Sequence, residues 1–476
     1  MASRRDLFQA HQFMVQRVVS GLVLRESDPP QSPLRRMGGT VFAGVMVAVL
    51  SLAVAGVIGV ISPGGNTTWQ ESGAVILEEG TGARYVWLAD EDGVEHLHPV
   101  VNFASGALLT GGTDVVSVSA ASLADAPRGR RLGIVGGPDG LPEPGRLADG
   151  GWTLCSAPAR LDSGEQQPLT AVVVGSTSSG GVALGERAVL VRDVERGTLH
   201  LVWQGHQYPV PDEDAVLEGL TLRTQPQVEV GTAWLSGLPA GEPLQPEPVA
   251  GRGAASAAVA GAVVGQVRVV RSGDGAQYYQ VAADRIVEIT EVQAAVLLAA
   301  PETAAQAYGG AVAEALPLTA AEANAAPREE LPDAVPTDPP AAPPAMAEVV
   351  GPEDTVCAGF SGATATPSIA VGATVDTTGA SPSPRQADAG TVLADLVVVA
   401  PGSGALVEAR PSGEASRGAL FLVTDEGWAY PVPSEDAAAR LGYGGVEPVA
   451  MPDQLVARVP TGPALTVTAA GAPALG

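Results

Sequence analysis

Two cysteines are the residues of this chain with the most definite chemistry. Cys155, in GWTLCS, and Cys357, in EDTVCAGF, are the only cysteines among 476 residues. In an oxidising compartment they would pair with each other, and the bond would close about 200 residues, which the loop-entropy model credits with roughly 5 kcal/mol as an upper estimate. The alternative is a reactive free thiol, for which the neighbouring sequence offers no plausible general base. We therefore favour a structural disulfide.

A second group of candidate residues combines two histidines with two aspartates. His96 and His98 are two positions apart, so in a β-strand both side chains would point to one face, and Asp90 and Asp92 come shortly before them. Such a group could bind a metal ion. However, His98 stands directly before a Pro-Val pair, where two similar segments of the chain carry tyrosine. We therefore expect His98 to have a packing role and assign no metal ligand.

The composition excludes several kinds of catalysis. All 26 basic residues are Arg and none is Lys, which removes a P-loop lysine, a Schiff base and a lysine general base. The glycine-rich turn at 136–145 contains prolines and no Lys, and no Ser lies in a G-x-S-x-G elbow. A net charge of −26 argues against a nucleic-acid surface. We expect no catalytic residue and no cofactor.

The sequence predicts a membrane anchor near the N-terminus, which would position the remainder of the chain. Residues 40–61 are 22 residues without a charge, and a helix of that length covers about 33 Å, enough for a bilayer core. Arg35 and Arg36 directly precede the segment, and the next basic residue is Arg84. Because basic residues that flank a transmembrane segment favour its cytoplasmic side, we expect a cytoplasmic N-terminus and an acidic body outside. A cleaved signal peptide would need a shorter leader than these 39 residues.

The cytoplasmic segment predicts an amphipathic helix over residues 3–23. Ser3 can cap it, and Asp6 lies where a carboxylate favours the N-terminal dipole. Leu7, Met14, Val15, Val18 and Leu22 fall on one face at 3.6-residue spacing, and the Arg and Gln side chains lie mostly elsewhere. The helix could dock on a partner protein, which we favour, or lie on the inner leaflet with its Arg near anionic lipid.

The body contains an internal repeat. Residues 85–100, 199–210 and 420–432 each combine an alternating apolar strand, a Gly-containing turn and a second strand that ends in His or Tyr before Pro-Val. This pattern predicts β-hairpins. A weaker fourth copy at 277–290 has no Pro-Val. Three copies continue into a short helix, a Val-rich strand and a Pro-x-Gly tripeptide, which ends at Gly129, Gly241 and Gly462.

Other structure must separate the repeats, because their spacing is irregular. Strand-like runs at 169–174 and 393–399 flank the cysteines and predict a central β domain, with the disulfide joining its two halves. Residues 316–350, rich in Ala, Pro and acids, predict a linker. The expected organisation is a cytoplasmic helix at 1–39, the anchor at 40–62, repeats at 63–145, 187–250, 251–315 and 405–462, central segments at 146–186 and 351–404, the linker, and a tail at 463–476.

Several motifs resemble the EccB family of actinobacterial type VII (ESX) secretion systems. They are RRDLFQAHQFMVQRVVSGLV, SPLRRMGG, GARYVWL with LHPVVNFASGALL, VSVSAASLADAPRG and LGYGGVEPVAMPDQLVARVPTGPAL. The resemblance covers essentially the whole chain. It implies a single-pass inner-membrane subunit with EccC, EccD and EccE as partners, and a periplasmic part of four repeat domains around a central domain closed by one disulfide. The third repeat departs from this pattern because its hairpin lacks Pro-Val.

We therefore expect an α+β fold: one transmembrane helix and an elongated extracytoplasmic region of four small α/β repeat domains around a disulfide-locked central β domain. The expected function is a structural subunit of the secretion complex that contacts copies of itself through its periplasmic region and supports protein export. The alternative is a peptidoglycan-binding anchor of the complex. Members of this family are sometimes described as ATPases, which the absence of Lys and of a Walker A motif disfavours here.

Overall fold

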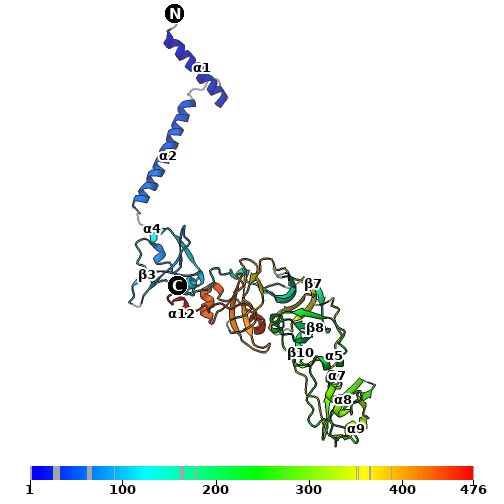
Figure 1. Cartoon of the computed structure of the whole chain (residues 1–476). Coiled ribbons are helices and arrows are strands. Elements are labelled where there is room, and N and C mark those ends of the chain that lie inside the picture. Colours follow the sequence, from blue (N-terminus) through cyan, green and yellow to red (C-terminus); the bar gives the residue numbers. More distant parts are fainter. Residues whose placement is uncertain are drawn as a thin grey trace. The chain divides into compact units, whose positions relative to one another are not determined.

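The computed structural model describes most of the chain as two compact units. It covers residues 3–24, 33–61, 67–90, 92–160, 164, 166–176, 179–273, 275–349, 351, 353–363, 366–387 and 389–474, with the backbone alone for 23–24, 33–37, 55, 58–61 and 179. One unit comprises Met1–Gln70 and Val118–Ala126, and the other comprises Glu71–Ser117 and Pro127–Gly476. The fold is mixed α/β with several small sheets (Figure 1).

The first unit is helical. It contains α1 (Arg4–Leu24), α2 (Pro33–Ile61), a 3-10 turn η1 (Thr68–Gln70) and α4 (Ala120–Leu123). The Ser3 hydroxyl accepts a hydrogen bond from the Arg5 N–H, and the Asp6 carboxylate accepts one from the Ser3 N–H at 3.0 Å. This confirms the predicted start of α1 and its cap. Helix α2 includes the whole apolar segment 40–61. In the part of the chain that is described, no helix has the combined length and apolarity that a membrane crossing requires.

Four small sheets, which we number as repeats 1 to 4, follow one plan. Each begins with three antiparallel strands, and a fourth strand then joins the outer edge of the first. Their strands are β1 (Val75–Glu78), β2 (Arg84–Ala89), β3 (Glu95–Pro99) and β4 (Val115–Val118) in repeat 1; β8 (Ala188–Asp193), β9 (Leu199–Trp203), β10 (His206–Pro209) and β11 (Gln227–Val230) in repeat 2; β12 (Val267–Ser272), β13 (Gly275–Val281), β14 (Ile286–Ile289), β15 (Leu316–Pro317) and β16 (Arg328–Glu329) in repeat 3; and β21 (Gly404–Arg410), β22 (Ala419–Thr424), β23 (Ala429–Pro431) and β24 (Val449–Pro452) in repeat 4.

The predicted hairpins are the second and third strands of these sheets. Strands β2 and β3, β9 and β10, β13 and β14, and β22 and β23 pair antiparallel. In three of them the proline ends the ladder, with Pro99 opposite Tyr85, Pro209 opposite His200 and Pro431 opposite Phe421. A proline fits there because it lacks the N–H that a continuing ladder would use. The hairpin predictions are therefore confirmed.

The predicted linker at 316–350 is wrong in its first part. Residues 316–329 form β15, helix α9 (Ala320–Ala325) and β16, and both strands pair in parallel with repeat 3. Leu318 and Ala323 are buried in the core of this repeat. A capping box between Thr319 and Glu322 starts α9. Composition suggested a loop because small residues dominate here, but Ala is the strongest helix former and needs little space when it packs.

The central sheet has seven strands drawn from two distant stretches. Its order is β19-β20-β6-β5-β17-β18-β7. The strands are β5 (Trp152–Arg160), β6 (Gln166–Val173), β7 (Ser179–Ala183), β17 (Val356–Phe360), β18 (Ser368–Thr374), β19 (Ser381–Pro382) and β20 (Leu396–Val398). Its apolar face shares one core with repeats 2 and 4, including Trp152, Trp234 and Val407. The sheet therefore connects two repeats that are far apart in the sequence.

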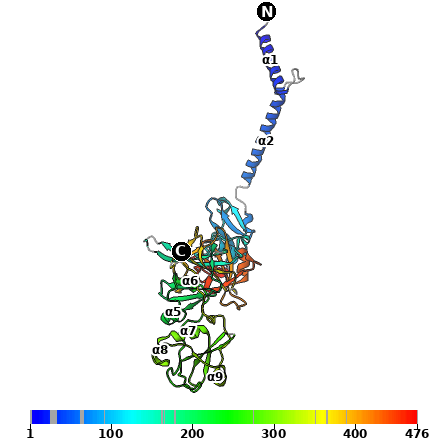
Figure 2. The ribbon, with the colours of Figure 1, turned by 90° about the vertical axis from the view of Figure 1, so that its right-hand side faces the viewer.

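Helices join the repeats in pairs. Helix α5 (Glu213–Gly219) of repeat 2 packs on α7 (Glu291–Ala299) of repeat 3, and the two lie side by side in both views (Figure 1 and Figure 2). A Cβ at Gly219 would lie 2.5 Å from the Ala295 carbonyl oxygen, so the crossing requires glycine. Asp212 caps α5, because its carboxylate accepts a hydrogen bond from the Ala215 N–H at 3.1 Å.

Repeats 1 and 4 are joined in the same manner. Helix α3 (Phe103–Thr110) of repeat 1 shares a core with α10 (Glu435–Ala438), the π-helical turn η3 (Ala439–Tyr443) and the C-terminal α12 (Val467–Ala470). Arg440 donates a hydrogen bond to the Leu108 carbonyl across this contact. The remaining short helices are η2 (Pro144–Arg146), α6 (Thr232–Ser236), α8 (Pro301–Ala307) and α11 (Asp453–Val456).

Candidate functional site

The two cysteines form the disulfide bond of the central sheet. Cys155 on β5 and Cys357 on β17 lie directly opposite each other, and their sulfurs are 2.07 Å apart across a sequence separation of 202. Both are buried, 0% and 1% exposed, and Ala373 packs against them. The structural disulfide is therefore confirmed and the free-thiol alternative is wrong. The bond covalently joins β5 and β17, which are far apart in the sequence and meet only in the folded sheet.

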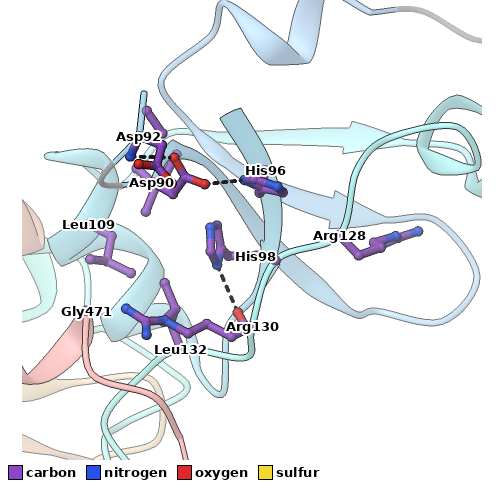
Figure 3. Close-up of a pocket in the computed structure, with 12 residues that line it drawn as sticks. Asp90, Asp92, His96, His98, Leu109, Arg128, Arg130, Leu132 and Gly471 are labelled. Carbon is purple, nitrogen blue, oxygen red and sulfur yellow. Dashed lines mark hydrogen bonds and ion pairs between the residues drawn. The ribbon is translucent and has the colours of Figure 1, made fainter. Parts of the chain in front are cut away.

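A pocket with a volume of about 680 Å³ lies on repeat 1. Asp90, Asp92, His96, His98 and Arg130 are among the residues that line it, and they come from the β2–β3 hairpin and the segment after Pro127 (Figure 3). The Asp90 carboxylate stabilises the hairpin turn, because it accepts hydrogen bonds from the N–H groups of Asp92 and Val94. The Nδ1 atom of His96 lies 3.5 Å from Asp90 Oδ2.

His98 has the packing role that its sequence position indicates. It is 8% exposed, and its Nδ1 lies 2.9 Å from the Arg130 carbonyl oxygen (Figure 3). A Cβ on Gly129 would lie within 2.6 Å of three atoms of the His98 ring, so the ring rests on glycine backbone. Within the described part of the chain, which leaves out Glu91, no three His, Cys, Asp or Glu residues are arranged to hold a metal ion.

The contact between ring and glycine recurs in two other repeats. A Cβ on Gly241 would lie 2.1 Å from the Tyr208 ring, and one on Gly462 would lie 2.4 Å from the Tyr430 ring. Real Cβ atoms do not approach this closely, so glycine is required at both positions. Each glycine ends a Pro-x-Gly tripeptide, at 127–129, 239–241 and 460–462, which we call the closing segment of its repeat.

Backbone hydrogen bonds hold each closing segment parallel to the second hairpin strand. The N–H groups of Leu97, Gln207 and Ala429 donate to the carbonyls of Pro127, Pro239 and Pro460 at 2.8–2.9 Å. Three residues after each glycine, a buried leucine donates its N–H to the hairpin proline; the leucines are Leu132, Leu244 and Leu465. The recurring structural pattern is therefore Pro-x-Gly-x-x-Leu, packed on an aromatic or His ring.

Burial keeps the two closing tyrosines neutral. Desolvation raises the pKa of Tyr208 to about 12, with a smaller contribution from the nearby Asp338. Desolvation also raises the pKa of Tyr430 to about 12, and the charge of Glu426 adds to it. The Tyr208 hydroxyl donates to the Asp338 carbonyl at 3.2 Å. Neutral rings allow these contacts to persist across the physiological pH range.

The Pro-x-Gly tripeptides were recognised in the sequence, but their contacts with the His98, Tyr208 and Tyr430 rings were not predicted. A signal was present, because the ring precedes the glycine by 31, 33 and 32 residues in the three repeats. A nearly constant separation between two distinct residue types is typical of a contact that is repeated in space.

The predicted topology residues lie in the helical unit. Arg35 and Arg36 belong to the first turn of α2, and their side chains lie outside the described residues. The apolar face of α1 is exposed, with Leu7 at 63%, Val18 at 58% and Leu22 at 79%. Helix α2 exposes large apolar side chains along its length, among them Phe42 and Leu52. Nothing within the described first unit covers either surface.

The glycine-rich turn at 136–145 serves the fold of repeat 1. The Asn102 side chain caps α3 and donates to the Ile134 and Gly137 carbonyls at 2.6 and 3.1 Å. Asp139 pairs with Arg84 at 3.1 Å and accepts from the Phe103 N–H. The turn therefore directs carbonyl and carboxylate oxygens at its neighbours, whereas a phosphate cradle presents N–H donors.

Comparison with known proteins gives consistent matches. The family described as "Type VII secretion system ESX-1, transport TM domain B" matches residues 1–473. The chain is 30% identical over 318 residues to the ESX-3 secretion system ATPase EccB3 of Mycobacterium tuberculosis (strain ATCC 25618 / H37Rv), covering 62% of this chain and 57% of the relative. It is 27% identical over 309 residues to the ESX-1 secretion system ATPase EccB1 of the same strain, covering 62% and 60%. The chain thus spans less than two thirds of the length of these relatives.

Solved structures share the fold. A chain of an intact ESX-5 inner membrane complex is 23% identical, with a TM-score of 0.60, and the match covers 100% of this chain and 96% of that chain. A chain of an EccB3 dimer from the ESX-3 core complex is 24% identical, with a TM-score of 0.59, and the match covers 84% and 100%.

Proposed function

Because the chain belongs to the EccB family of type VII secretion systems, we propose that it is a structural subunit of an ESX inner-membrane complex and supports protein export. The observation that carries this proposal is a fold shared over its whole length with a chain of an intact inner-membrane complex. Four repeats and a cross-linked sheet suit a rigid scaffold. The energy for export would come from a partner that hydrolyses ATP.

The proposed anchor is a single span at residues 40–61. This segment has no charged residue, and Phe42, Leu50 and Leu52 are each more than half exposed. A helix that is apolar on all sides needs lipid or protein around it. Arg35 and Arg36 before the span and the acidic body after it support a cytoplasmic N-terminus and a periplasmic C-terminal region.

Helix α1 is proposed to bind partner subunits on the cytoplasmic side. Its exposed apolar face matches the helix-in-groove mode of recognition, in which anchors recur every three or four residues. Partners of the EccC, EccD and EccE type are the proposed candidates. The body outside is proposed to contact further copies of this chain, as two copies do in the dimer of EccB3.

We assign no catalytic role to the chain. The matched relatives carry the word ATPase in their names, and this chain offers no Lys with which to contact a terminal phosphate. We therefore expect the purified protein to show no ATP hydrolysis that depends on a residue of this chain. Hydrolysis that a single substitution abolishes would contradict this expectation.

Affinity purification from gently solubilised membranes tests the proposal. We expect the wild-type chain to elute in a large complex with other secretion subunits. The double variant Leu7→Ser/Val18→Ser removes two exposed anchors of α1 and should reduce recovery of those partners by about tenfold, while the chain stays in the membrane fraction. The control Gln9→Ser/Gln16→Ser changes the polar side and should recover the full complex.

Two outcomes would contradict the proposed function. One is recovery of the chain without other membrane subunits. The other is saturable retention on isolated cell wall in place of membrane partners, which would favour the peptidoglycan anchor.

A further inference from the structure

Repeat 3 contains a fourth closing segment that lacks the glycine. The Ile286 N–H donates to the Pro327 carbonyl at 2.9 Å, as Leu97, Gln207 and Ala429 donate to their closing prolines. Arg328 then pairs in parallel with Ile286, and Glu329 pairs with Val287. The tripeptide at 327–329 therefore corresponds in space to the three Pro-x-Gly segments.

Both members of the ring–glycine contact are replaced together. Val287 stands in the position of the ring, and Glu329 stands in the position of the glycine. The exchange is physically consistent, because a smaller side chain on the strand leaves room for a Cβ on the closing segment. However, Val287 is only half-buried, whereas Tyr208 and Tyr430 are 1% and 3% exposed. The replacement therefore buries much less apolar surface.

Repeat 3 also lacks one backbone hydrogen bond that the other three repeats have. In the other repeats, the residue five positions after the closing proline is a leucine that donates its N–H to the hairpin proline. Five positions after Pro327 the chain has Pro332, which has no N–H to donate.

A surface ion pair takes the place of these contacts. Arg285 Nε lies 2.9 Å from Glu329 Oε2, and the two side chains are 48% and 57% exposed. Exposed ion pairs contribute little and are screened by salt. The side chains of β16 are exposed at both of its positions.

We infer that the closing segment at 327–329 is a strap that opens locally, because only its backbone pairing with β14 and the exposed Arg285–Glu329 ion pair hold it, whereas the other three segments are also locked by a ring on glycine. Opening frees the edge of β14 at Ile286 while the rest of repeat 3 stays folded. It also loosens the chain that follows, where the Thr337 carbonyl accepts from the Glu242 N–H of repeat 2. The strap is therefore a built-in site of conformational change between repeats 2 and 3.

Hydrogen exchange of the full-length chain in detergent tests this inference at matched positions. After correction for intrinsic rates, the Ile286 amide should exchange at least about tenfold faster than the Gln207 and Ala429 amides, because exchange follows local opening. Raising NaCl from 0.1 to 1 M should accelerate exchange at Ile286 by about threefold and leave Gln207 and Ala429 unchanged. Equal protection at the three amides would overturn the inference.

Variants separate the ion pair from general loosening. Glu329→Gln should accelerate exchange at Ile286 and remove its salt dependence, whereas Glu330→Gln, a neighbouring exposed carboxylate 3.5 Å from Arg328, should do neither. The double variant Val287→Tyr/Glu329→Gly rebuilds the lock and should slow exchange at Ile286 toward the Gln207 value. No change in Ile286 exchange in either Glu329→Gln or the rebuilt variant would also overturn the inference.

Discussion

The double variant Cys155→Ala/Cys357→Ala is expected to lower the stability of the central sheet by about 5 kcal/mol, the upper estimate for a bond that closes a loop of this size. The bond joins β5 to β17 across a separation of 202 residues. Without the bond, the unfolded chain regains the conformational entropy that closing this loop had removed. We expect the thermal transition of this sheet to fall by about 10 °C or more, measured by calorimetry of the full-length chain in detergent.

Reduction provides the control for this prediction. A reducing agent should shift the transition of the wild-type protein toward that of the double variant and leave the variant unchanged. Alanine is the suitable replacement, because the two sites are 0% and 1% exposed and a serine hydroxyl would be buried there. A loss of less than about 2 °C would mean that packing alone holds the two halves of the sheet together.

The second large effect is expected at the closing glycines. Gly241→Ala and Gly462→Ala should each destabilise the protein by about 3 kcal/mol, at the upper end for overpacking, because the new Cβ would lie 2.1 or 2.4 Å from a buried tyrosine ring. The ring cannot move away, since Tyr208 and Tyr430 lie in packed cores. Chemical unfolding of the purified full-length chain measures the loss.

A control and a coupling measurement make this prediction specific. Gly140→Ala should have almost no effect, because its Cβ would meet no atom within 4 Å and its φ is not in the left-handed region. Removing the ring should relieve the clash, so the cost of Gly241→Ala should shrink markedly when Tyr208→Leu is already present. Additive costs would show that the ring and the glycine do not interact.

Sequence patterns predicted the parts of the fold that depend on local chemistry. Alternating apolar residues and a terminal proline identified the hairpins at Pro99, Pro209 and Pro431, because a proline that ends a strand leaves a clear mark. The short helix after the repeat 2 hairpin was also predicted, and in the structure Asp212 caps it. The disulfide was predicted because the chain has only two cysteines to pair.

The missed features depend on contacts between distant residues. The ring–glycine contacts join positions more than 30 residues apart, so neither residue alone indicates its partner. The closing segment of repeat 3 was hidden because Pro327-Arg328-Glu329 has no glycine and lies in a stretch whose composition suggested a linker. The Thr319–Glu322 capping box was the local signal that could have placed a helix there.

The proposed role in an inner-membrane complex depends most directly on the orientation of the chain about one retained membrane segment. Both native cysteines are bonded, so a single introduced cysteine gives a unique thiol. Val312 is 87% exposed on the body, and Gln12 is exposed on α1. Spheroplasts that express Val312→Cys or Gln12→Cys would be treated with a membrane-impermeant maleimide. We predict labelling of Val312→Cys in intact spheroplasts and labelling of Gln12→Cys only after lysis. Protection of Val312→Cys, or loss of Gln12 from the mature protein, would contradict the account.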